Sequence, residues 1–318
     1  MKYVSLILSL AVLVIAPFFG EITLNIQEIL NPASSSSMLF WEIRSPRVII
    51  AFCSGAILSL AGLVFQSVFR NPLTTPFTLG VASGATLGTA LAIVFFGGLL
   101  FWQYALSFFG ALLTVIVLFL LSRSLKSAQT SSLLLVGIAL SFFYSAALMV
   151  LYYLSDFEQS YSIVRFTMGS LNIVGFDTAY PIIIVSLLFL VSILWQRKPL
   201  RLLLTSLDFT FLKGVHVTRL IMSLLLITSL AVAVCVSVVG PIGFVGLIVP
   251  HIIKLLYRRS SDTLILPTFF YGGIFLVACD LVARNLGAAS DIPIGVVTSF
   301  IGGPFFFYLI LHRHKGSR

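Results

Sequence analysis

The segment Pro46–Phe69, PRVIIAFCSGAILSLAGLVFQSVF, decides the fold class. It runs for 24 residues with a single charged side chain, that of Arg47. An α-helix of roughly 17–25 mostly apolar residues crosses the hydrocarbon core of a bilayer. The segment therefore predicts a transmembrane helix.

Nine further apolar segments of comparable length flank it on both sides. They are Tyr3–Phe19, Pro76–Gly97, Phe101–Ser122, Ser131–Leu154, Thr178–Trp195, Val217–Val239, Ile242–Tyr257, Thr263–Arg284 and Ile292–Leu311. The third and eighth of the ten spans are rich in glycine, and the eighth is short. The first resembles a signal peptide, but its apolar run is long and no small-x-small cleavage site follows, so we expect a retained span.

Composition agrees with a lipid environment. Hydrophobic residues make up 59% of the 318 residues and charged residues only 9%, against roughly 25% charged in soluble domains. No soluble domain fits between two spans. We therefore predict one domain over residues 1–318, an all-α integral membrane protein with ten transmembrane helices. Cys53, Cys235 and Cys279 lie inside apolar runs and are expected to be packing residues rather than metal ligands.

The net charge of +9 reflects topology rather than nucleic-acid binding, because the basic residues form short clusters between apolar runs. Ten spans place both termini on one side. With the termini in the cytoplasm, 15 of the 19 Lys and Arg lie inside, and only Arg44, Arg47, Arg165 and Arg284 lie outside. Eight of the ten Asp and Glu lie toward the outside. This split predicts an inner-membrane protein with both termini cytoplasmic.

Three loops are longer than simple turns. The outer loop at 21–44 contains Ile22–Leu30, which we expect to form a short amphipathic helix on the membrane. Residues 155–177 form a second outer loop. The inner loop at 196–216 is basic, and its apolar positions predict either short helices that dock a partner or an amphipathic linker.

Glycine and proline mark three places where backbones approach closely or leave the helix. Gly80, Gly84 and Gly88 are four residues apart, which favours tight helix packing and is compatible with a pathway-lining role. The segment 70–76, RNPLTTP, is either a rigid hairpin turn or a constriction at the inner face. The segment 240–251, GPIGFVGLIVPH, should not form a plain helix, and we expect His251 to be a packed residue.

Charged residues gather at the outer ends of two spans. Asp280 and Arg284 are four residues apart and can pair on one helical face. An acidic residue inside a span indicates function by default, although the pair also suits a helix end. Arg44, Arg47 and Arg284 could receive carboxylates of a soluble partner or anchor lipid headgroups.

The chain lacks a Gly-x-x-x-x-Gly-Lys-Ser/Thr phosphate loop, a His-Glu-x-x-His zinc helix and a Gly-x-Ser-x-Gly elbow. We therefore assign no catalytic residues and no metal site. Apart from Asp280, the spans lack the carboxylates of an ion-coupled carrier. The energy for transport is then expected from another subunit.

Taken in order, several motifs resemble one family, the FecCD or BtuC-like permeases of binding-protein-dependent ABC importers for iron-siderophores, haem and vitamin B12. The matching stretches are RSPR at 44–47, RNPLTTPFTLGVASGATLG at 70–88, GSL at 169–171, GPIGFVGLIVPH at 240–251, CDLVAR at 279–284 and DIPIGVVTSFIGGPFFFYLI at 291–310. The resemblance covers about residues 40–311. It implies a type II importer permease of ten helices.

The resemblance also implies partners and site residues. The partners would be a second permease copy, two cytoplasmic ATPase subunits that bind ATP and Mg²⁺, and an extracytoplasmic binding protein; no cofactor is expected on this chain. Arg44, Arg47 and Arg284 would meet the binding protein. Inner gating would fall to Asn71, Leu73, Thr130 and Ser131, and ATPase contact to Leu207, Asp208, Lys213 and Gly214.

Two departures qualify the match, because Lys213 stands where the family usually has Leu, and Asp291 where Glu is usual. Two other classes were weighed. An ion-coupled secondary transporter would need coupling-ion sites near mid-membrane, and an intramembrane hydrolase would need a paired nucleophile and base. The motifs are shared by permeases for different chelates, so the sequence does not select one substrate.

Overall fold

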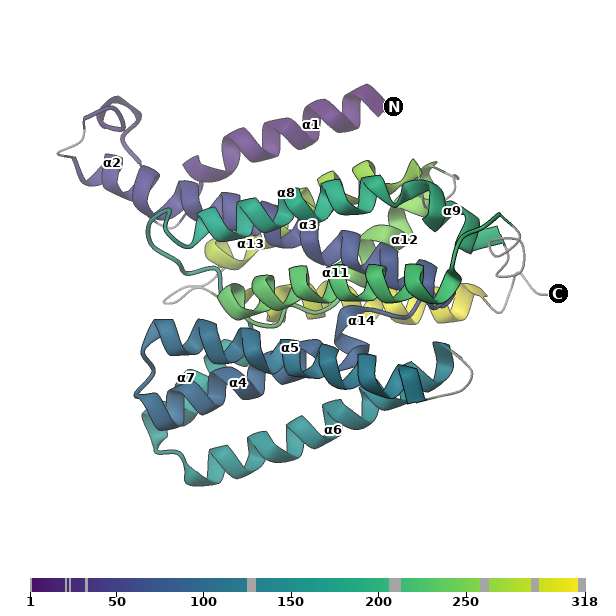
Figure 1. The fold of residues 1–318 in the computed structure, drawn as a ribbon. Coiled ribbons are helices and arrows are strands. Elements are labelled where there is room, and N and C mark those ends of the chain that lie inside the picture. The colour runs from purple at the N-terminus through teal and green to yellow at the C-terminus, as the bar shows by residue number, and fades with distance from the viewer. Residues whose placement is uncertain are drawn as a thin grey trace.

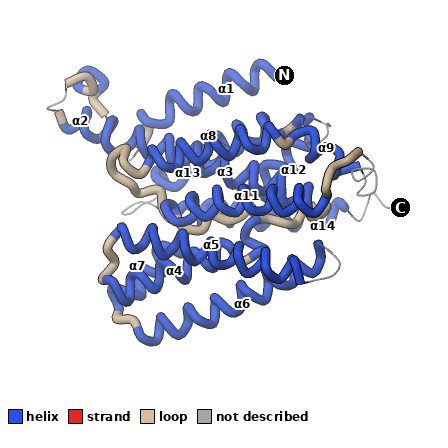
Figure 2. The backbone as a smooth tube through the Cα atoms, viewed as in Figure 1, coloured by secondary structure: helices blue, strands red, loops and turns tan. Residues whose placement is uncertain are grey.

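The structure is a computed structural model that describes residues 2–20, 22, 24–31, 34–124, 130–205, 213–257, 263–286 and 292–313. Within these ranges every regular element is helical (Figures 1 and 2). The α-helices are α1 (Lys2–Ile15), α2 (Ser35–Met38), α3 (Ser45–Val68), α4 (Val81–Phe96), α5 (Leu100–Ser124), α6 (Thr130–Leu154), α7 (Phe157–Thr167), α8 (Ala179–Trp195), α9 (Arg197–Thr205), α11 (Val217–Val239), α12 (Val245–Tyr257), α13 (Ile265–Leu286) and α14 (Ile294–Arg313).

Shorter helical segments connect some of these. Three are 3₁₀ turns, η1 (Ala16–Phe18), η2 (Ile26–Glu28) and η4 (Pro76–Leu79), and η3 (Leu39–Arg44) is a π-helical segment that joins α2 to α3. As a result, Ser35–Val68 is one continuous helix of 34 residues.

The predicted spans correspond to helices of this fold. In the described part of the chain, 5 helices are long and apolar enough to cross a membrane, and the pair α8 and α9, bent by 60°, makes up to 6. Four shorter apolar helices, in α1, α4, α12 and α14, match the remaining predicted spans. The all-helical membrane fold expected from the sequence is confirmed.

Helix α3 forms the centre of the bundle, with 89% of its apolar window buried. It packs against α8, α11, α12 and α13. Small residues permit this: a Cβ at Gly55 would overlap the backbone of Gly272 in α13, and one at Gly62 would overlap Gly246 in α12. The Ser59 hydroxyl donates to the carbonyl of Thr268 at 2.9 Å. Small residues that bring backbones together are the usual basis of packing between transmembrane helices.

A second group of helices, α4 to α7, lies on one side of this centre (Figure 1). Helices α4 and α5 pack through Gly84 and Gly88, where an added Cβ would meet the backbone of Gly110 or Leu106. Helix α11 contacts both groups and joins them. The packing role predicted for Gly84 and Gly88 agrees with these contacts.

Gly80 differs from the other two glycines of its motif. It has φ +77° and caps the start of α4, where it faces Gly137 and Ser141 of α6 rather than α5. Gly80 therefore packs against α6 as a helix cap, whereas Gly84 and Gly88 pack against α5. The four residues before it, Pro76–Leu79, form the 3₁₀ turn η4, so the third span becomes a full α-helix only at Val81.

Two other expectations about local structure are corrected, and one loop contains a helix that was not predicted. The eighth span becomes helical only at Val245, because Gly240 and Phe244 adopt left-handed backbone at φ +72° and +66°. The second outer loop contains helix α7. Among residues 22 and 24–30, which the structure describes, the helical part is the 3₁₀ turn η2 rather than the predicted amphipathic helix. The three cysteines are buried and unpaired, as expected.

Candidate functional site

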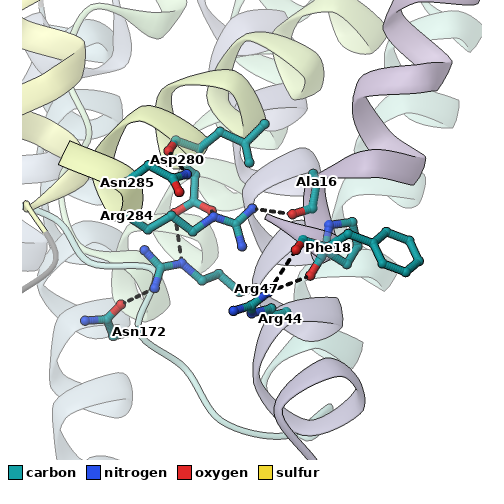
Figure 3. Close-up of polar contacts among 10 residues, drawn as sticks. Ala16, Phe18, Arg44, Arg47, Asn172, Asp280, Arg284 and Asn285 are labelled. Carbon is teal, nitrogen blue, oxygen red and sulfur yellow. Dashed lines mark hydrogen bonds and ion pairs between the residues drawn. The ribbon is translucent and has the colours of Figure 1, made fainter. Parts of the chain in front are cut away.

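The end of the bundle that the charge pattern predicts to face outward holds a buried cluster of charged side chains (Figure 3). Arg47, in the first turn of α3, donates from Nε to Asp280 Oδ1 at 2.9 Å and from Nη1 to Asn172 Oδ1 at 2.7 Å. Asp280 lies on α13 and is fully buried, and Asn172 lies in the loop after α7. One guanidinium therefore joins three parts of the chain that are far apart in sequence.

Arg284 completes the cluster from the next turn of α13. Its Nε lies 3.5 Å from Asp280 Oδ2, so the pair predicted from the spacing of four residues is confirmed. Its Nη2 donates to the carbonyl of Ala16 at 2.8 Å. Carbonyl groups at a helix C-terminus lack intrahelical partners and interact well with cations. Arg284 thereby ties the end of α1 to α13.

Arg44 also bonds the segment that follows α1 to another helix. Its guanidinium donates to the carbonyls of Pro17, Phe18 and Ile22, which follow α1. The side chain thus holds the chain that leaves α1 against the start of α3.

Burial bears on the predicted docking role of these arginines. Arg44, Arg47 and Arg284 are 7%, 8% and 5% exposed, and all three donate to groups of their own chain. A cation waiting for a soluble partner, or for a lipid headgroup, would be expected at the surface. Docking by these residues stays a prediction, and their contacts within the chain are the observed role.

At the predicted inner end, the segment 70–76 forms a turn fixed by its own polar groups. Asn71 Oδ1 accepts from the backbone N–H of Leu73 at 3.0 Å, and the carbonyl of Asn71 accepts from the hydroxyl of Thr74 at 2.8 Å. Thr75 and Thr78 form a capping box that starts η4. Asn71 and Leu73 are half-buried in this rigid turn. Their gating role stays a prediction.

The turn is bonded to the inner loop. Arg70 has φ +49°, and its Nη2 donates to the carbonyl of Leu203 in α9 at 2.6 Å. Because α9 lies in the loop predicted to meet the ATPase, this bond links two predicted functional segments directly. Sequence reasoning did not identify this link.

A second polar link near the inner end was also missed. The Lys254 ammonium donates to Gln66 Oε1 at 3.0 Å, and Gln66 Nε2 donates to the carbonyl of Gly246 at 3.1 Å. Gln66 is 4% exposed. A buried glutamine in an apolar span is a signal that could have been noticed, because buried amides require partners.

Other predicted residues lie partly outside the described residues. Leu207 and Asp208 fall there, as do the side chains of Thr130 and Ser131, which open α6. Lys213 and Gly214 form an exposed turn in which Gly214 has φ +78°. Glycine tolerates this conformation best.

The last candidates are His251 and the side chains that could ligate a metal ion. His251 packs edge-on against Phe305 with ring centroids 5.9 Å apart, as expected for a packed histidine. Within the described ranges, no three His, Cys, Asp or Glu side chains gather closely enough to hold a metal ion.

Comparison with known proteins gives consistent results. The model of the FecCD transport family matches residues 7–312. The hemin transport system permease protein HmuU of Yersinia pestis is 33% identical over 306 residues, which cover 93% of this chain and 90% of the relative. The molybdate import system permease protein MolB of Haemophilus influenzae is 35% identical over 285 residues, covering 88% and 82%. A solved ABC transporter of metal-chelate type, in an inward-facing conformation, shares 32% identity with a TM-score of 0.85 and 96% coverage of both chains.

Proposed function

The chain belongs to the FecCD transport family and is a membrane-spanning permease subunit of an ABC importer, and from this premise we propose that it carries a large metal chelate into the cytoplasm. The chelate would be an iron-siderophore, haem or a cobalamin-type compound. The observation that carries the proposal is the identity to the hemin permease over nearly the whole of both chains. A permease of this kind is a transport component rather than an enzyme.

The likeness to the molybdate permease favours a second candidate. At 35% identity, that relative is as similar as the hemin permease, so a small oxyanion is the alternative cargo.

The substrate test is uptake by proteoliposomes. The permease would be reconstituted with the ATPase and the binding protein encoded beside it, and supplied at equal concentrations with labelled ferric siderophore, haem, cobalamin or molybdate. The proposal predicts accumulation of one chelate. Accumulation of molybdate alone would establish the second candidate instead.

An importer permease works with ATPase subunits and a binding protein. We propose ATP and Mg²⁺ on the ATPase and none on this chain. ATP binding would close the ATPase pair, and the inner loop at 196–216 would pass that movement to the helices. Leu207, Asp208, Lys213 and Gly214 are the proposed contacts, and the exposure of the last two in a turn supports this.

We propose that two copies of the chain form the passage, with α6 and α14 facing the partner copy. Only 17% of the apolar window of α6 is buried, and Phe142 on α6 and Phe300 on α14 are 73% and 82% exposed. Because all three native cysteines are buried, single cysteines at these positions can be tested for disulfide cross-linking. Leu188→Cys, on the exposed face of α8, is the matched control. Cross-linking of the control alone would contradict this arrangement.

We propose that both termini lie in the cytoplasm. Helix α1 begins, and α14 ends, at the same end of the bundle as α9 (Figure 1). The excess of Lys and Arg in the loops at that end supports the orientation. This orientation also places the non-helical turn of Asn71 and Leu73 at the cytoplasmic end, which supports these residues as part of an inner gate, because non-helical backbone at membrane depth needs a protein or water-filled setting. Thr130 and Ser131, at the start of α6, are the proposed second part of that gate.

Docking of the binding protein by Arg44, Arg47 and Arg284 can be separated from their structural role. Arg47→Gln removes the guanidinium, whereas Asp280→Asn keeps it and removes the charge of the carboxylate that it contacts at 2.9 Å. A docking role predicts that Arg47→Gln weakens binding of the binding protein, while Asp280→Asn preserves or strengthens it. If both variants lost affinity for the binding protein equally, and in proportion to their loss of thermal stability, the arginines would have a structural role without a docking role.

A further inference from the structure

A basic pocket lies at the inner end of the bundle, at the corner where α8 bends into α9. The bend of 60° opens a space of about 670 Å³ between this corner and the start of α13. Arg197, Lys198 and Arg201 line one side of the pocket, and Leu194, Leu202 and Leu266 contribute apolar walls. The pocket therefore offers positive charge and hydrocarbon together.

The geometry of α9 explains why its charges face the pocket. Leu200 and Leu203 are 0% and 1% exposed and anchor the helix to the bundle. Arg197 and Arg201 are four residues apart, so they lie on one helical face, and both are exposed. The helix is therefore amphipathic, which suits a position along the membrane surface.

The apolar walls continue into the surface that faces lipid. On α8, Leu187, Leu188 and Val191 are 53–62% exposed, and Trp195, the last residue of this helix, is 87% exposed. Tryptophan is enriched at the level of lipid headgroups. An acyl chain lying along α8 would thus place its headgroup at the basic side of the pocket.

We propose that this pocket binds the phosphate of an anionic phospholipid of the inner leaflet. Arginine guanidinium groups match phosphate oxygens in two-point geometry, and basic pockets between helices on the cytoplasmic side suit such headgroups. The proposal rests on the cytoplasmic placement of α9 proposed above. An acidic surface of the ATPase would match the positive charges of the pocket. It would not cover the apolar walls, which continue into the lipid-facing side of α8.

The lipid would act on the segment that couples the subunits. Helix α9 is joined to the inner turn by the bond from Arg70 to the Leu203 carbonyl. A lipid bound at the corner between α8 and α9 would therefore restrict the movement of both α9 and the predicted gate.

The test is the amount of phosphatidylglycerol that stays bound to the purified full-length permease after extraction from vesicles of phosphatidylcholine and phosphatidylglycerol, measured by native mass spectrometry. Arg197→Gln/Arg201→Gln is compared with Arg165→Gln/Arg219→Gln, which removes two exposed positive charges elsewhere. We expect about a 25-fold loss in the first variant, because each of the two basic residues near an anionic surface contributes roughly fivefold, and little change in the second.

Leu266→Trp provides a variant with unchanged charge. Leu266 is 56% exposed in the pocket wall, so the larger side chain should fill the space and lower bound phosphatidylglycerol without altering the fold. Equal lipid loss in both double variants, or none in any variant, would overturn the proposal. So would retained lipid with weakened ATPase binding in Arg197→Gln/Arg201→Gln, which would assign the pocket to the ATPase. A wrong orientation of the chain would be seen separately, by labelling α9 from the other side of sealed vesicles.

Discussion

Helices α3 and α6 are nearly equal in apolar character and opposite in position. Their most apolar windows have mean hydropathy 2.5 and 2.3, yet 89% of the first and 17% of the second is buried within the chain. Hydropathy alone therefore identifies a membrane span but does not tell whether it lies at the centre or at the edge of the bundle.

Residue size accounts for the difference. Helix α3 carries Gly55, Ser59 and Gly62 at its contacts with α13 and α12, whereas α6 exposes Phe142 and Tyr153. Lipid is as apolar as a leucine side chain, so close packing and polar contacts, rather than hydrophobicity, draw helices together in a membrane. The four predictions below test this contrast, from the largest effect to the smallest.

Gly62→Leu in α3 should abolish folding. The new side chain would overlap the backbone of Gly246, and backbone cannot rotate away as a side chain can. Size-exclusion chromatography of the purified protein should show aggregate in place of a single peak. Gly243→Leu, in the segment before α12, is the control, because nothing lies within 4 Å of its added Cβ, and it should purify normally. A well-folded Gly62→Leu would show that α3 is not tightly packed.

Asp280→Ala should lower the free energy of unfolding by about 3–5 kcal/mol, the usual cost of removing one member of a buried ion pair. It leaves the guanidinium groups of Arg47 and Arg284 buried without their carboxylate. The midpoint of thermal unfolding measures the effect, and Asp177→Ala, at an exposed position, should change it little. Equal midpoints in the two variants would show that the cluster contributes nothing to stability.

Gly84→Leu should destabilise the protein by about 1–3 kcal/mol, as overpacking commonly does. Its Cβ would lie 2.6 Å from the carbonyl oxygen of Gly110, so α4 and α5 would have to separate. ATP-dependent uptake should fall along with the thermal midpoint. A fully active and stable variant would rule out the close contact.

Phe142→Ala on α6 should change the stability of the single chain by less than about 0.5 kcal/mol, because the ring is 73% exposed. Ile57→Ala on α3, at 0% exposure, should cost about 2–5 kcal/mol by the same unfolding measurement. Similar losses in both would mean that α6 is as central as α3.

Much of the fold could be predicted from the sequence, because a long apolar run can form little other than a transmembrane helix. Helix α7 was missed since Phe157–Thr167 is polar, although Asp156 and Gln159 form a capping box that marks its start. Gly80 has the same spacing as Gly84 and Gly88, yet its left-handed backbone makes it a cap, and spacing alone carries no backbone angle.

The candidate site likewise contains some contacts that the sequence predicts and others that depend on how the helices pack. The pair Asp280 and Arg284 could be predicted because four residues make one helical turn. The partner Arg47 lies 233 residues away in sequence, and Lys254 lies 188 residues from Gln66, so these contacts depend on how the helices pack. The burial of the three outer arginines could not be foreseen either, because charge alone placed them near the surface.

The most direct test of the central account is the energy source of transport. Proteoliposomes containing the permease, its ATPase and its binding protein would be given the labelled chelate, with ATP on the ATPase side or with an imposed proton or sodium gradient. The account predicts accumulation with ATP alone, lost when the binding protein is omitted. Accumulation that follows the ion gradient without ATP would contradict it and identify an ion-coupled secondary transporter.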